Sequence, residues 1–187
     1  QTLDLGITRA NLVPMTAQPV TTSGLEPDDL AQALSKSSDW PGTGGPVEWI
    51  QTHISHVFLV GDRVFKLRKA VRFSFLDFGT TALRNADCLN EVSLNRRLSP
   101  DVYLGIAPLI SAPGTEDGVR VGAIGESVID PEAEHVVVMR RLPKGSDAHS
   151  LLKAGALAPH HLASTATRID AFHATQGLGR PAPWSPE

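Results

Sequence analysis

Two residues of opposite charge, Lys66 and Glu91, have the setting that a phosphate-binding site needs. Lys66 lies in the predicted strand Val64–Arg68 and shares a face with Val64, which is unusual for a simple exposed lysine. Glu91 lies near the edge of an apolar stripe on a predicted helix, where its carboxylate would be partly desolvated without a partner. Pairing would satisfy both charges and fix a cation where nucleotide phosphates could bind. Spacing alone favours the more ordinary interpretation, in which Lys66 is an edge-strand lysine and Glu91 is solvated near Arg84.

The segment His53–His56 precedes this lysine and predicts a short turn between two strands. Its backbone N–H groups and the Ser55 hydroxyl could bind an anion. His53 and His56 could suggest a metal, but no third ligand lies near them in the sequence and strand-like geometry would separate them. We therefore predict no zinc or other metal site in the chain.

A run of basic residues surrounds the predicted lysine strand, and two interpretations of it remain open. It could be a phosphate-facing surface, or a solvated strand edge that charge protects against aggregation. The run consists of Arg63, Lys66, Arg68, Lys69 and Arg72.

Composition limits the classes of protein to consider. With 187 residues, 41% hydrophobic and 20% charged, the chain can form one globular domain, or one domain and a fragment of a second. Seventeen Lys and Arg against 20 Asp and Glu argue against a dedicated nucleic-acid partner. A single cysteine, Cys88, excludes an internal disulfide framework. The sequence shows no apolar run as long as a membrane span and no visible signal peptide, so we predict a cytoplasmic protein without a membrane partner.

Periodicity and breakers predict an α+β chain in which one long helix is inserted into an antiparallel sheet. The predicted strands are Val47–His53, Val57–Val60, Val64–Arg68, Tyr103–Ile110, Val119–Ile124, Glu126–Ile129 and His135–Leu142. The predicted helices cover residues 26–36, 80–98, 147–154 and 159–175. On the helix 80–98, the predicted buried stripe consists of Leu83, Ala86, Leu94 and Leu98.

Taken in order, these elements resemble the N-terminal, kinase-like half of the aminoglycoside phosphotransferase-like proteins. The similarity is to the bacterial branch in which a P-loop ATP-binding domain follows that half. It runs from about Val47 to Ala174, and it is most specific in THISHVFLVGDRVFKL (52–67), VRFSFLDF (71–78), EVSLNRRLSPDVYLG (91–105), VVVMRRLP (136–143) and IDAFHA (169–174).

The resemblance implies three domain segments. Residues 1–25 would form an N-terminal tail. Residues 26–143 would form a protein-kinase-like N-lobe with a leading helix and a hinge. Residues 144–187 would begin a helical C-lobe and stop before the catalytic loop.

The resemblance also implies a role for each residue of an ATP site. Lys66 would hold the α- and β-phosphates, and Glu91 would orient it. Ser55, with neighbouring backbone, would cover the phosphates, although the glycine-rich kinase pattern is missing there. The passage from Met139 to Leu142 would contact adenine through its backbone, with Met139 lining the pocket. This passage also contains Arg140 and Arg141.

The catalytic loop of the HxDxxxxN type does not occur in residues 1–187, so we assign no catalytic residue to this chain. The ligands of Mg²⁺ are expected beyond residue 187, in the remaining C-terminal part of the parent protein. The resemblance implies phosphoryl transfer from MgATP to a hydroxyl of a small-molecule acceptor, with this chain inactive alone. Two alternatives remain open: a non-catalytic nucleotide-binding or regulatory module, and a partner-binding β domain without a ligand.

Overall fold

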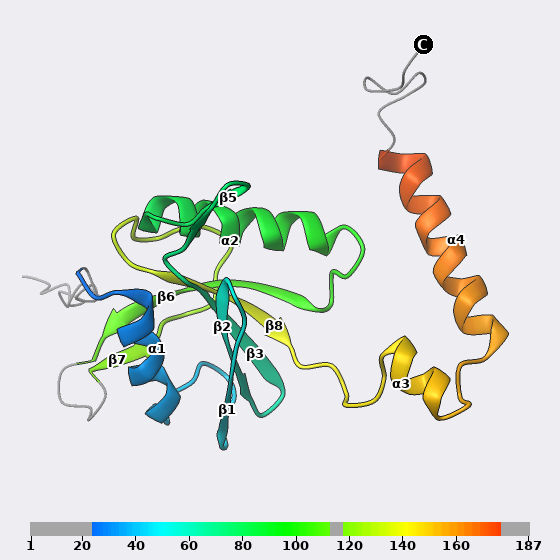
Figure 1. The fold of residues 1–187 in the computed structure, drawn as a ribbon, viewed down its shortest axis with the longest axis horizontal. Coiled ribbons are helices and arrows are strands. Elements are labelled where there is room, and N and C mark those ends of the chain that lie inside the picture. The colour runs from blue at the N-terminus through cyan, green and yellow to red at the C-terminus, as the bar shows by residue number, and fades with distance from the viewer. Residues whose placement is uncertain (1–23, 113–117, 177–187) are drawn as a thin grey trace, which may run out of the picture.

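The structure is a computed structural model that describes residues 24–112 and 118–176 (Figure 1). A six-stranded antiparallel sheet has the order β1-β2-β3-β8-β6-β7. Its strands are β1 (Val47–Gln51), β2 (Ser55–Val60), β3 (Arg63–Arg68), β6 (Tyr103–Ser111), β7 (Val119–Val121) and β8 (His135–Arg140). The other elements are the hairpin of β4 (Arg72–Phe73) and β5 (Leu76–Asp77), and the helices α1 (Pro27–Lys36), α2 (Thr81–Arg96), α3 (Ala148–Lys153) and α4 (Pro159–Gln176). The predicted α+β class is confirmed, and residues 1–23 of the predicted tail lie outside the described residues.

A tight hairpin joins β2 to β3, and its loop is one residue shorter than the Gly61-Asp62-Arg63 connection that the sequence predicts. Val60 pairs with Arg63, so Gly61 and Asp62 form the two-residue loop. Gly61 has φ of 52°, a left-handed conformation that a residue with a Cβ adopts only at a cost. β3 then lies between β2 and β8, which places Lys66 on an interior strand and not on an edge strand.

The two faces of the sheet are covered differently. One face packs against α1 and the ring of Trp40 to form the main hydrophobic core, whose largest fully buried side chains include Phe58, Phe65 and Leu67. The other face carries α2 (Figure 1), with Cys88 and Val92 packed on Ile106 and Val137. Side chains alternate along a strand, so Val64, Lys66 and Arg68 point to the α2 side.

The buried face of α2 differs from the predicted stripe. Leu83 is 43% exposed and Leu94 is 58% exposed, whereas Arg84 and Asn85 are buried beside Cys88 and Val92. The prediction of a leucine stripe was therefore wrong. A helix can bury polar side chains when each finds a partner inside the protein, and periodicity does not show such partners.

Those partners lie in residues 133–135, where the chain enters β8. The Arg84 Nε donates to both carboxylate oxygens of Glu134, at 3.1 and 3.0 Å. The Asn85 amide nitrogen donates to the Ala133 carbonyl at 2.9 Å, and its oxygen accepts from the His135 N–H at 3.1 Å. These contacts fix the N-terminal half of α2 on the sheet.

The segment predicted as the strand Glu126–Ile129 is irregular. Just before it, Gly125 forms an isolated bridge to β6 through reciprocal backbone hydrogen bonds with Ile106 of 3.0 and 2.8 Å. Gly105 has φ of 148°, and a Cβ there would lie 2.4 Å from the Gly125 carbonyl oxygen. The two backbones thus approach too closely for a side chain at Gly105, and this contact replaces the regular pairing that the strand prediction required.

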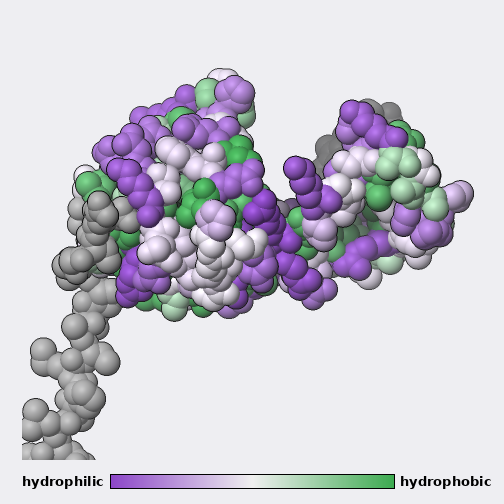
Figure 2. Space-filling view, turned by 90° about the horizontal axis from the view of Figure 1, so that it is seen from below, coloured by the Kyte–Doolittle hydropathy of each residue, from purple (hydrophilic) through white to green (hydrophobic). Residues whose placement is uncertain are grey.

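The helices predicted near residues 147–154 and 159–175 are present as α3 and α4, on one side of the sheet-bearing part (Figure 1). An indentation with hydrophilic side chains on both sides separates the two parts in the space-filling view (Figure 2). The Arg168 Nε donates to the Leu98 carbonyl at 3.0 Å, and the Arg97 guanidinium lies 4.7 Å from the ring centre of Phe172.

No helix in the described ranges is long and apolar enough to cross a membrane.

Two buried histidines make stability depend on pH. Desolvation lowers the pKa of His56 and of His135 below the ordinary 6.5. The unfolded chain therefore binds more protons than the folded chain just below pH 6.5, and acid stabilises the unfolded state. We expect the free energy of unfolding, measured by urea denaturation, to fall as the pH drops from about 7 to about 5. His135→Asn should flatten that slope, and the same change at exposed His149 should not.

Candidate functional site

Lys66 and Glu91 form a direct ion pair between β3 and α2. The Lys66 Nζ lies 3.0 Å from each carboxylate oxygen of Glu91. The Lys66 side chain is 25% exposed and that of Glu91 is 12% exposed, so the pair is shielded but open at the lysine. The structure thus brings together the two residues with which the sequence analysis began, and the interpretation of an edge lysine beside a solvated glutamate is wrong.

Arg68 is a second cation on the same carboxylate, although the sequence indicated it only as one member of the basic run. Its Nη2 contacts Glu91 Oε2 and lies 2.5 Å from Asp87 Oδ2. The Arg68 side chain is only 5% exposed, and its guanidinium also lies 5.4 Å from the ring centre of Phe78. Two regularities could have indicated it: Arg68 shares a strand face with Lys66, and Asp87 precedes Glu91 by one helical turn.

Ser55 lies in a different place from the one predicted. It is the first residue of β2 and is fully buried, and its hydroxyl accepts a hydrogen bond from Arg68 Nη1 at 3.1 Å. The turn between β1 and β2 consists of residues 52–54, and the Thr52 hydroxyl accepts there from the Ser55 N–H at 3.0 Å. In this structure the Ser55 hydroxyl therefore supports Arg68, and an anion at the turn would meet the backbone of residues 52–54.

A largely apolar pocket of about 530 Å³ lies on the same sheet face as the ion pair. Leu59 pairs with Val64, Val64 with Met139, and Met139 with Tyr103, so these four side chains form a row across β2, β3, β8 and β6. All four line the pocket. Val64 precedes Lys66 by two residues, a distance of about 7 Å along a strand. Lys66 does not itself line the pocket, but it lies next along the same sheet face from the pocket residue Val64.

Four consecutive residues, from Met139 to Leu142, line the other side of this pocket. The backbone N–H groups of Arg140 and Arg141 are already engaged, at 2.8 Å with the Val102 carbonyl and at 2.7 Å with the Asp62 carbonyl. The Arg141 Nη2 lies 2.9 Å from Oε2 of Glu48, which also lines the pocket. A base in the pocket would therefore meet the backbone of this passage at Leu142 rather than at those two N–H groups.

Two titratable groups next to the ion pair, Tyr103 and Cys88, are held neutral. Desolvation, followed by the negative charge of Glu91, raises the pKa of Tyr103, which keeps the phenol protonated. Burial raises the pKa of the Cys88 thiol to about 12, and this thiol contacts the His135 carbonyl at 3.6 Å. A protonated, buried thiol is a poor nucleophile, so Cys88 acts in packing.

In residues 24–112 and 118–176, no three His, Cys, Asp or Glu side chains gather closely enough to hold a metal ion. His56 is bonded through Nε2 to Asp28 at 2.7 Å, on the α1 side of the sheet.

Comparison with known proteins finds similar chains but gives no activity. No family model matches the sequence, and no solved structure matches it. Uncharacterized proteins of Mycobacterium bovis and Mycobacterium tuberculosis are 36% identical over 123 residues, which cover 66% of this chain. The match spans 22% of the length of these relatives, so it concerns one part of much longer proteins.

Proposed function

We propose that the chain is the nucleotide-binding portion of an ATP-dependent small-molecule phosphotransferase, built as a kinase-like N-lobe with the first helices of a C-lobe. The observation that carries this proposal is the apolar pocket that opens, on one sheet face, beside the Lys66–Glu91 pair. A nucleoside triphosphate has the matching order of parts, with a flat apolar base at one end and anionic phosphates at the other.

In the proposed complex, the base lies over the neighbouring side chains of Val64 and Met139 and contacts the backbone at Leu142. The phosphates then extend along β3 toward Lys66, whose Nζ has three donors and can bind an oxygen while it keeps Glu91. Tyr103 closes the inner end of the pocket as a neutral phenol, so it adds no negative charge opposite the nucleotide.

Phosphoryl transfer depends on position and charge neutralisation more than on covalent chemistry by the protein. This chain's contribution is to hold the base and to fix Lys66 against the phosphates. Magnesium, when bound, would neutralise charge on the transferring phosphoryl group. Its ligands, the catalytic base and the site of the hydroxyl acceptor are assigned to the rest of the parent protein, and the chain alone is expected to be inactive.

Closing the pocket tests this proposal. We expect Val64→Phe to fill the space for the base and to weaken MgATP binding by at least about tenfold, as calorimetry with the full-length protein would measure. Ile50→Phe is the matched control, because Ile50 is exposed on β1 and lines no pocket described here. MgATP binding that is the same in both variants would contradict a base in this pocket.

Turnover separates the proposal from its alternative. A phosphotransferase should release ADP from MgATP when the correct hydroxyl acceptor is added to the full-length protein. Tight, saturable MgATP binding without ADP release across a broad panel of hydroxyl compounds would instead favour a regulatory nucleotide-binding module.

A further inference from the structure

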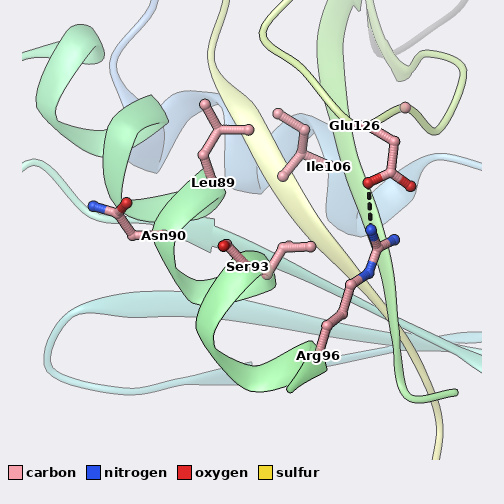
Figure 3. A pocket seen from close by; sticks show the side chains of 8 residues that line it. Leu89, Asn90, Ser93, Arg96, Ile106 and Glu126 are labelled. Atoms are coloured by element: carbon pink, nitrogen blue, oxygen red, sulfur yellow. Dashed lines mark hydrogen bonds and ion pairs between the residues drawn. The ribbon is translucent and has the colours of Figure 1, made fainter. Parts of the chain in front are cut away.

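A second pocket, of about 430 Å³, lies between α2, β6 and the irregular segment 122–126 (Figure 3). It shares no lining residue with the pocket beside Lys66. At 100° per residue, Glu91 lies at one edge of the buried face of α2, and Leu89 and Ser93 lie at the other. This second pocket is therefore a separate site across the helix from the ion pair.

The pocket combines an apolar floor with a polar rim. Leu89, Val92 and Ile106 line the floor, and half-buried Leu89 is the most accessible of the three, since Val92 and Ile106 are almost fully buried. Ser93 brings a hydroxyl to the rim, and Asn90 lines the outer edge with its amide pointing away from Arg96 and Glu126 (Figure 3). A concave site of this size, with a few polar groups around an apolar floor, suits a small organic molecule.

Arg96 places one fixed cation at the end of the pocket. Its Nε donates to the Tyr103 carbonyl at 2.7 Å and its Nη2 to the Leu104 carbonyl at 2.6 Å, so the guanidinium cannot turn away. The third nitrogen, Nη1, contacts the carboxylate of Glu126 (Figure 3). The guanidinium is thus oriented in advance toward a carboxylate at the pocket.

Glu126 is the more exposed member of this ion pair. Its side chain is 71% exposed against 28% for Arg96, and the hydrogen bond from Arg96 lowers its pKa. Exposed ion pairs contribute little free energy, so a second carboxylate can compete for the guanidinium at small cost. Glu126 therefore holds the position that the carboxylate of a ligand would take.

We propose that this pocket binds a small organic carboxylate with an apolar body. The carboxylate takes the place of Glu126 on Arg96, and the apolar body packs on Leu89, Val92 and Ile106. The proposal does not depend on nucleotide binding, because it uses a different set of residues.

Calorimetry with phenylacetate on the full-length protein tests this site. We expect phenylacetate to bind saturably. Its uncharged analogue phenylacetamide should bind at least about tenfold more weakly. Glu126→Gln removes the competing carboxylate and should tighten phenylacetate binding by about three- to fivefold. Glu132→Gln is the matched control, because Glu132 is exposed in the same connection and lines no pocket described here; it should leave the affinity unchanged.

A blocking variant tests the location. Ser93 is exposed at the rim, so Ser93→Trp should fill the pocket without disturbing the core and should abolish phenylacetate binding. Arg96 is left intact, because its substitution would also free two backbone carbonyls of the sheet. The proposal is overturned if phenylacetate binds neither the wild-type protein nor Glu126→Gln, if phenylacetamide binds equally well, or if Ser93→Trp keeps the affinity.

Discussion

Lys66→Met in the full-length protein should lower kcat/KM for MgATP by about a hundred- to a thousandfold, which is the usual loss when one transition-state charge contact is removed. Methionine fills a similar volume but brings no charge to the phosphates. Glu91 keeps Arg68 as a partner after the change, so its carboxylate is not left buried and unpaired. The fold should therefore persist, and steady-state kinetics at saturating acceptor would measure the effect directly.

Lys69→Met provides the matched control for that experiment. Lys69 follows Lys66 by three residues, and its Nζ donates at 2.9 Å to Gln51, away from the Glu91 carboxylate. The control should keep kcat/KM for MgATP within about twofold, because half-buried Lys69 makes no contact with the Lys66–Glu91 pair. Comparable losses in the two variants, or near-normal turnover in Lys66→Met, would refute the role proposed for Lys66.

The order of the strands and helices was predictable because their signals are local. Gly61 and Asp62 between two apolar runs predict the β2–β3 hairpin, and α2 begins and ends close to its predicted limits. The short hairpin of β4 and β5 was not predicted, because strands of two residues give no periodicity. The irregular path near Gly125 depends on a close approach to Gly105, which no local pattern indicates.

The site was predictable only in part, because its remaining features depend on contacts distant in the sequence. The burial of Arg84 follows from Glu134, 50 positions away, and that contact turns α2 so that Leu83 and Leu94 face outward. The same rotation brings Asp87 and Glu91 to Arg68. The sequence shows the charges, but only the orientation of α2 decides which of them meet.

The second prediction with a large expected effect on MgATP binding concerns Arg68. Two cations, Lys66 and Arg68, balance the two carboxylates of Glu91 and Asp87. Lys66 can therefore bind phosphates without repulsion from an excess negative charge. Arg68→Met leaves one excess negative charge next to Lys66. We expect MgATP binding to the full-length protein, measured by calorimetry, to weaken by about ten- to a hundredfold, since a like charge within a few ångströms in a shielded site costs about 1.4 to 3 kcal/mol.

Asp87→Asn in the Arg68→Met background separates this electrostatic effect from a structural one. The double variant restores the charge balance but not the hydrogen bond from Arg68 to Ser55, so it should recover most of the lost MgATP affinity without recovering thermal stability. Arg68→Lys keeps the charge but cannot reach Ser55, Asp87 and Glu91 together, and should be intermediate. If the double variant binds MgATP as weakly as Arg68→Met, Arg68 acts by holding β2, β3 and α2 together and not through its charge.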